Sequence, residues 1–229
     1  MALGAAAVVV AGGGAMVGAR ALAGDDGADL VVVGDSFAEQ SHRQLLAQAD
    51  DRGIDAEVFA LGGTAVCGWD PQLQDLADHA PDHLVLSFAG NDLQPCINDT
   101  GQPRPPEVVA DDYRADIEAV IEQFRPDGTR VHVVLPPPIR DAQFEANAAA
   151  MRDMYRALAA DHPDVPVIDP SPLLGPDGAF HATLPCRPDE PCDPDGTVTL
   201  RQDDGIHLTD DGGGRYAESI LTAVFPDAS

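Results

Sequence analysis

The chain has 229 residues, and a composition that is 44% hydrophobic and 23% charged suits one globular domain with a sizeable core. Its 39 acidic residues outnumber 13 basic residues, all of them Arg, and give a formal net charge of -26. Binding to nucleic acid depends on Lys and Arg that neutralise phosphates, so this charge excludes nucleic-acid binding as the main function. The acidic residues are spread along the chain, which is typical of solubility or salt adaptation.

The first residues are typical of an export segment. Residues 1–19 are uncharged and contain only Ala, Gly, Val, Leu and Met, and Ala21-Leu22-Ala23 behind them resembles a signal-peptidase site. We expect residues 1–24 to be a signal peptide or, through the apolar stretch, a retained membrane anchor. A buried Ala/Gly-rich helix is the alternative. The folded domain is then expected over 25–229, in a secreted or cell-surface protein of bacterial type.

From residue 30 onward, short apolar runs alternate with longer segments of helical period. This alternation predicts a three-layer α/β/α sandwich with a five-stranded parallel sheet and no second domain. The strands are expected at 30–33, 57–61, 84–88, 131–135 and 165–168. The helices are expected at 41–51, 73–79, 105–125, 141–161 and 209–225. Residues 169–204, rich in Pro, Asp and Gly, form a long loop of a kind that is usually functional, stapled or disordered.

Small or polar residues follow three of the expected strands. Ser36 comes after the first, Gly62-Gly63 after the second and Asn91 after the third. The carboxyl ends of parallel strands meet at one edge of a sheet, and ligands of open α/β sheets bind outside that edge. The sequence therefore predicts a site where these residues converge.

Asp204-Gly205-Ile206-His207, just before the last helix, completes a candidate catalytic triad. A serine hydroxyl is a poor nucleophile unless an imidazole takes its proton, and the imidazole needs a partner on Nδ1. Ser36 is the expected nucleophile, His207 the base and Asp204 its partner, with the adjacent Asp203 as the alternative.

A tetrahedral intermediate also needs donors aimed at its oxyanion. The candidates are the backbone N–H groups of Ser36 and Gly63 and the side-chain amide of Asn91. This chemistry needs no cofactor. A calcium loop starting at Asp193 lacks the closing Glu and the right glycine position, so no metal is assigned.

Together these residues resemble the SGNH or GDSL-type hydrolases over about residues 29–225. The resemblance rests on Gly34-Asp35-Ser36, a glycine after the second strand, Gly90-Asn91-Asp92 and Asp204-x-x-His207, in that order. It implies a flavodoxin-like strand order and the triad and oxyanion roles given above. Phe37 replaces the usual leucine. The second block lacks the frequent asparagine, which leaves the choice between Gly62 and Gly63 open, with Gly63 favoured.

The four cysteines and two further residues are expected to shape the pocket. An even number of cysteines on an exported chain favours two disulfides over zinc, since no Cys-x-x-Cys pair exists. Cys67 follows the second strand and Cys96 the third, so their loops should lie side by side on the catalytic edge, where a disulfide would rigidify the oxyanion-hole segments. Cys186 with Cys192 would then staple the long loop. Trp69 is a candidate wall of an acyl or sugar site, with buried packing as the alternative. Pro137, after the fourth strand, is expected at the rim.

The leading hypothesis is an exported serine esterase. The resemblance implies that it acts on short-chain acyl esters, often acetyl esters, of a carbohydrate or a small soluble molecule. A monomer is expected. One alternative keeps the triad and transfers the acyl group to a cell-surface glycan. Another is an inactive carbohydrate-binding domain, against which the intact Ser36, Asn91 and His207 argue.

Overall fold

The computed structural model describes residues 28–188 and 190–228. The signal peptide or anchor expected over 1–24 therefore lies outside the described residues. Among the helices that the structure does describe, none is both long and apolar enough to span a bilayer.

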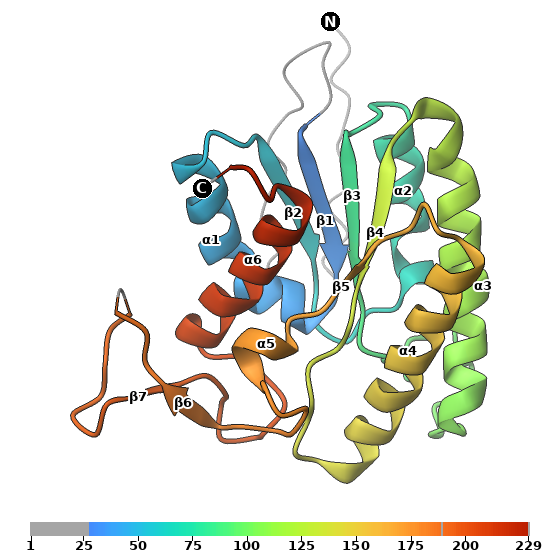
Figure 1. Cartoon of the computed structure of the whole chain (residues 1–229). Helices are drawn as coiled ribbons and strands as arrows, with labels where there is room; N and C mark the ends of the chain where they lie inside the picture. The colour runs from blue at the N-terminus through green and yellow to red at the C-terminus, as the bar shows by residue number, and fades with distance from the viewer. Residues whose placement is uncertain (1–27, 189, 229) are drawn as a thin grey trace, which may run out of the picture.

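A parallel sheet of five strands forms the centre of the molecule (Figure 1). The strands are β1 (Leu30–Gly34), β2 (Ala56–Ala60), β3 (His83–Ser87), β4 (Arg130–Val134) and β5 (Val167–Ile168). Their order is β2-β1-β3-β4-β5, which confirms the flavodoxin-like arrangement. In the register of the sheet, Gly34 at the end of β1 lies between Ala60 of β2 and Ser87 of β3. The segments that leave these three strands therefore start side by side.

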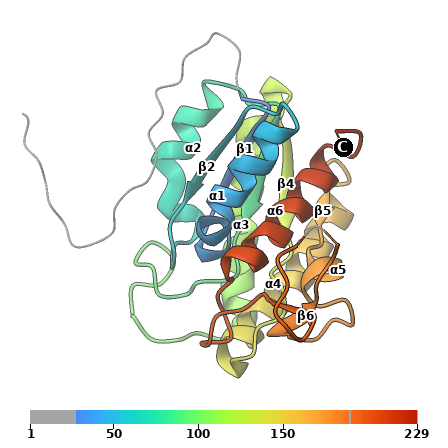
Figure 2. The same cartoon turned by 90° about the vertical axis from the view of Figure 1, so that its left-hand side faces the viewer.

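Helices cover both faces of the sheet, which confirms the three-layer sandwich (Figures 1 and 2). One face carries α1 (Ser36–Asp51) and α6 (Asp210–Val224), and the other carries α2 (Asp70–Ala77), α3 (Pro106–Phe124) and α4 (Ala142–Asp161). Side chains of a strand alternate between faces, so Leu30 and Val32 pack into one core cluster while Val31 and Val33 pack into the other. Both faces of β1 are thus buried, as its unbroken apolar sequence predicts.

Helix α1 begins at Ser36, five residues before the expected start at residue 41. The cause is Asp35, whose side chain accepts a hydrogen bond from the N–H of Phe37 and caps the helix. Phe37 and Ala38 are buried, so the helix packs against the sheet from its first turn. Ser36 consequently lies at a helix N-terminus, just after strand β1.

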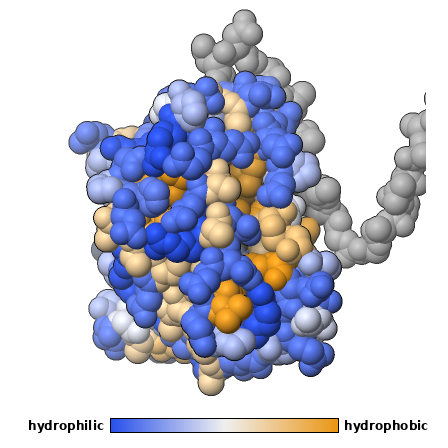
Figure 3. All heavy atoms as spheres, turned by 90° about the vertical axis from the view of Figure 1, so that its right-hand side faces the viewer, coloured by the Kyte–Doolittle hydropathy of each residue, from blue (hydrophilic) through white to orange (hydrophobic). Residues whose placement is uncertain are grey.

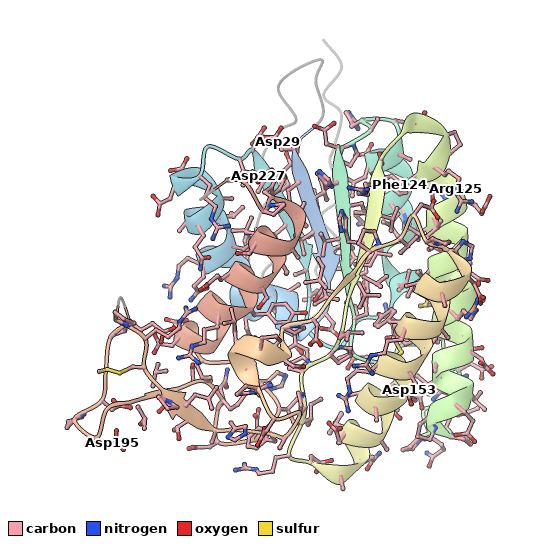
Figure 4. The ribbon with its side chains drawn as sticks, in the orientation of Figure 1. Asp29, Phe124, Arg125, Asp153, Asp195 and Asp227 are labelled. Carbon is pink, nitrogen blue, oxygen red and sulfur yellow. A yellow bond between two sulfur atoms is a disulfide. The ribbon has the colours of Figure 1, made fainter. Side chains whose placement is uncertain are left out.

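The long segment before α6 is ordered rather than structureless. It contains the short helix α5 (Ser171–Leu174) and an antiparallel pair formed by β6 (Thr183–Pro185) and β7 (Thr197–Thr199). The disulfide Cys186–Cys192 closes the connection between these strands, and Figure 4 shows it as a yellow bond near Asp195. Glu190 from this connection forms an ion pair of 2.7 Å with the buried Arg215 of α6. The disulfide thus closes the connection on itself, and the ion pair holds it against α6.

Candidate active site

One cavity of about 460 Å³ joins the predicted site residues at the carboxyl edge of the sheet. Its lining includes Ser36, Gly62, Gly63, Asn91 and His207. They come from four separate segments of the chain, three of which leave neighbouring strands. The structure therefore brings together the nucleophile, base and oxyanion candidates that the sequence predicts.

His207 and Asp204 form a close pair. Asp204 Oδ2 lies 2.6 Å from His207 Nδ1, and its Oδ1 accepts the backbone N–H groups of Ile206 and His207 at 2.8 and 3.0 Å. Partial burial raises the pKa of Asp204, but these N–H groups and the ring outweigh it and lower the pKa to about 2. Asp204 is therefore a carboxylate at neutral pH that fixes the ring with a proton on Nδ1 and Nε2 free to accept one. Among the described residues, Asp203 contributes only its backbone carbonyl, which accepts from Arg140.

Ser36 occupies the first position of α1, where backbone N–H groups have no partner within the helix. Within residues 28–188 and 190–228, neither its Oγ nor its N–H has a hydrogen-bond partner, and Oγ is not bonded to His207. Nucleophile and base therefore line one cavity without yet forming the bond that proton transfer needs. Such bonds are often long in structures without substrate and shorten when it binds.

The structure distinguishes Gly62 from Gly63. The N–H of Gly62 donates to Glu39 Oε2 at 2.8 Å, whereas the N–H of Gly63 has no acceptor among the described residues. Gly63 has a φ of +78°, in the left-handed region that favours glycine. Its N–H is thus the one that remains available to an oxyanion, which supports the preference for Gly63.

The amide of Asn91 is held in place from two sides. Its Nδ2 donates to Asp35 Oδ2 at 3.0 Å and to the carbonyl oxygen of Thr64 at 3.1 Å. Both partners are acceptors, so the NH₂ group must point toward them. Tyr113 Oη donates to the backbone carbonyl of Asn91 at 3.0 Å. Because both amide hydrogens are engaged, Asn91 can donate to an oxyanion only if one of these bonds is shared or released.

Asp35 is fully buried beneath the site and accepts three hydrogen bonds. Besides Asn91 Nδ2, the donors are the N–H of Phe37 at 3.1 Å and the N–H of Ala89 at 2.8 Å. Burial raises the pKa of Asp35 to about 6, against the lowering effect of these N–H groups and of His207. This aspartate therefore connects the start of α1 to the segment that carries Asn91.

Two side chains that the sequence did not reveal hold the His207 loop. Gln40 of α1 accepts the N–H of Leu208 at 2.7 Å. Arg201, which is 2% exposed, donates to the carbonyl oxygens of Ile206 and Pro138 at 2.9 and 3.1 Å. Its guanidinium also lies over the ring of Phe37, 5.8 Å from the ring centroid. Phe37 directly follows the nucleophile Ser36 in the chain.

Arg201 has no carboxylate partner among the described residues. Burial lowers its pKa to about 10. The guanidinium therefore remains charged at neutral pH and is stabilised by carbonyl oxygens and aromatic faces. It links the base, the nucleophile segment and the loop after β4.

The two predicted substrate-binding residues lie elsewhere. Trp69 is 8% exposed, belongs to the hydrophobic core and donates Nε1 to Thr64 Oγ1 at 3.0 Å. Pro137 is buried in the segment after β4. Neither lines the cavity of Ser36 and His207, whose apolar walls are instead Ile139, Phe144 and Ile206. Trp69 thus has the buried packing role that was the alternative. It bonds the side chain of Thr64, whose backbone carbonyl holds Asn91.

The disulfide Cys67–Cys96 joins the segments after β2 and β3, with the pairing expected from their positions. It fastens the 3-10 helix Val66–Trp69 to the chain that follows Asn91. Two disulfides are compatible with export. Among the described residues, no group of three or more His, Cys, Asp or Glu side chains is arranged to hold a metal ion.

Solved structures with this architecture share low sequence identity with the chain. An acetyl xylan esterase, AlAXEase, is 19% identical with a TM-score of 0.59, over 86% of this chain and 100% of its own. A variant of an acetyl xylan esterase from Geobacillus stearothermophilus is 12% identical with a TM-score of 0.63, over 87% and 95%. A GDSL-like lipase from Bacteroides thetaiotaomicron is 14% identical with a TM-score of 0.60, over 85% and 86%. Among curated proteins, no significant match exists.

The strand order and these likenesses define a protein with the SGNH or GDSL-type hydrolase fold, as the resemblance in sequence implies. Within that class, the chain belongs to the family described as "Protein of unknown function (DUF459)", whose model matches residues 29–223.

Proposed function

We propose that the protein is an exported serine esterase that hydrolyses short-chain acyl esters, acetyl esters in particular. The observation that carries this proposal is the shared cavity, which Ser36 and His207 both line, with Asp204 Oδ2 2.6 Å from His207 Nδ1. Proteins of the same fold named as acetyl xylan esterases support the choice of acetyl esters. The two disulfides support export.

In the proposed reaction, His207 Nε2 takes the proton of Ser36 Oγ as the oxygen attacks the ester carbonyl. The N–H groups of Ser36 and Gly63 stabilise the oxyanion, with the Asn91 amide as the third donor. Collapse of the tetrahedral intermediate breaks the bond to the alcohol, which leaves with the proton from His207. Water then attacks the acyl-enzyme, again with His207 as base, and releases the acid and free Ser36.

The test is hydrolysis of p-nitrophenyl esters from acetate to octanoate by the parent and by Ser36→Ala, His207→Ala and Asp204→Asn. We expect activity to be highest for the shortest chains. Removal of Ser36 or His207 should lower kcat by about 10⁴-fold or more. Asp203→Asn is the matched control for Asp204→Asn, because its carboxylate does not contact the ring. An inert parent, or Ser36→Ala with parental activity, would refute the proposal.

A further inference from the structure

A second cavity of about 410 Å³ adjoins the one that holds Ser36. The two cavities share Gly63, Gly90, Asn91 and Phe144 in their linings. Two of these are the proposed oxyanion donors. When the carbonyl of an ester lies at those donors, a group bonded to that carbonyl can therefore reach the second cavity.

Part of this second cavity is an exposed apolar wall. Leu93 is 63% exposed and Phe144 is 48% exposed, and both line it. Asp141 Oδ1 accepts the backbone N–H of Phe144 at 3.2 Å and so fixes the backbone of Phe144 in the first turn of α4. Figure 3 shows hydrophobic patches in the lower part of the face that carries α3 and α4, toward the carboxyl edge of the sheet. Exposed apolar side chains that gather at a cavity mark a binding site rather than ordinary surface.

The rest of the lining is polar and has unused hydrogen-bonding capacity. Asn147 donates Nδ2 to the carbonyl of Gly90 at 3.1 Å, and its Oδ1 has no partner in the described part of the chain. The amide of Gln143 is likewise unbonded to any described residue. Arg104 beside them has a buried Nη2 without a partner among these residues. An alkyl chain in this cavity would leave the amides and the guanidinium without partners at a cost.

Charge further limits what the cavity can take. Arg104 Nε lies 2.7 Å from Asp92 and Nη1 lies 2.6 Å from Asp112, so its charge is already balanced. The chain as a whole carries a net charge of -26 and repels anions. An anionic occupant is therefore disfavoured, and the lining suits an occupant with an apolar face for Phe144 and hydroxyl groups for the amides.

We infer that this second cavity binds the alcohol part of the ester and that this part is a neutral sugar ring. The inference rests on the proposed function and names the alcohol that the function leaves open. The C–H face of a pyranose covers the exposed ring of Phe144, and its hydroxyls take the hydrogen bonds that Asn147 and Gln143 offer.

The experiment compares kcat/KM for monoacetylated xylobiose, a neutral sugar ester that keeps free hydroxyls, with kcat/KM for ethyl acetate, which has no ring. We expect Phe144→Ala to lower the ratio of kcat/KM for the sugar ester to kcat/KM for ethyl acetate by about tenfold, mainly because KM for the sugar ester rises. Phe144→Tyr keeps an aromatic face and should restore the ratio to within about threefold of the parent value. Val108→Ala is the matched control, since Val108 is 40% exposed and lines neither cavity.

Two results would overturn the inference while the esterase proposal stands. One is an unchanged ratio in Phe144→Ala. The other is a selective loss on p-nitrophenyl octanoate relative to the acetate, which would make the cavity an acyl-chain site. If the parent hydrolyses no ester, the esterase proposal fails. Calorimetric titration of Ser36→Ala with xylotriose then tests whether the second cavity binds a sugar. Binding that Phe144→Ala abolishes supports a sugar site, and no binding refutes it.

Discussion

At the scale of single residues, Asp35 affects the site most directly, through its contact with Asn91. The carboxylate orients the amide that is proposed to meet the oxyanion, and it also caps the helix that begins with Ser36. One buried side chain therefore sets the position of both the nucleophile and an oxyanion donor. Its role is positioning, because the carboxylate is fully buried and its oxygens already accept three N–H donors.

We expect Asp35→Asn to lower kcat for p-nitrophenyl acetate by at least about tenfold, because an amide can accept only through its oxygen and cannot serve all three donors. Outright loss of an oxyanion donor costs about 10²- to 10³-fold, which bounds the effect. Steady-state kinetics measures it. Asp78→Asn, at an exposed aspartate, is the control and should match the parent. Parental kcat in Asp35→Asn would contradict a positioning role.

The raised pKa of Asp35 also predicts how stability varies with pH. Burial raises this pKa from 3.8 to about 6, so between those values the folded protein holds a proton that the unfolded chain has lost. Stability from this group is therefore full below pH 4 and is lost as pH rises to 6, by about 3 kcal/mol. Urea unfolding of the parent and Asp35→Asn between pH 4 and 7 tests this. The stability of the parent relative to the variant should fall across the window, and parallel curves would argue against it.

The sequence reveals Ser36, Asn91 and His207 because each stands in a short local motif at a strand end or before a helix. Arg201, Gln40 and Phe144 carry no such motif, since their contacts join segments far apart in the chain. Trp69 shows the opposite case, in which closeness in sequence wrongly suggests a place in the pocket. Its closeness in sequence to the second block suggested a pocket wall, yet the 3-10 helix that follows turns it into the core.

Among the elements, the loop that carries Asp204 and His207 depends on Arg201. Its guanidinium joins the carbonyl oxygens of Ile206 and Pro138, so it connects this loop to the segment after β4. A lysine ammonium has no planar fork for two carbonyl groups. The arrangement of the base thus rests on a side chain that lies outside the triad.

We expect Arg201→Met to lower kcat by about tenfold or more, and Arg201→Lys to recover only part of it, because the two carbonyl groups lose their common donor. Arg43→Met is the control, because the Arg43–Asp210 pair is about three-quarters exposed and contributes little. Activity equal to the parent in Arg201→Met would exclude the positioning role.

The two disulfides should differ in their contribution to stability. Cys67–Cys96 closes a separation of 29 residues and Cys186–Cys192 a separation of 6. From the entropy of loop closure, the first disulfide should add about 3.6 kcal/mol and the second about 2.2 kcal/mol to the free energy of unfolding. Denaturant unfolding of the Cys67→Ala/Cys96→Ala and Cys186→Ala/Cys192→Ala variants measures both. The first pair should also lower esterase activity more, because it fastens the segment after Asn91. The reverse order of both effects would contradict this account.

The boundaries of elements were harder to predict than their order. All five sheet strands were expected in the right places because each is an apolar run between turn residues. Helix α1 was expected five residues late because Ser36, Phe37 and Ala38 do not show helical period by themselves, while the Asp35 cap decides the start. Strands β6 and β7 were missed because each has only three residues, and tertiary contacts and a disulfide hold them.

For the molecule as a whole, the excess of 39 acidic over 13 basic residues predicts a marked response to salt. Repulsion among like charges destabilises the compact state, and added ions screen it. We therefore expect Tm at pH 7, followed by circular dichroism, to rise between 20 mM and 1 M NaCl. Sodium sulfate at equal ionic strength separates screening from salting-out. A Tm that falls with NaCl would mean that ion pairs such as Arg187–Glu218 outweigh the repulsion.

The direction of the parallel strands has a practical consequence for handling the protein. Strand β1 starts at Leu30, on the edge of the sheet opposite the one where Ser36 lies, and α6 runs back from the His207 loop toward that same far edge (Figure 1). An affinity tag, carrier protein or solid support joined before residue 28 or after residue 228 therefore meets the domain on the side away from the cavity. A bulky polymer could then approach the opening even when the protein is immobilised by either end.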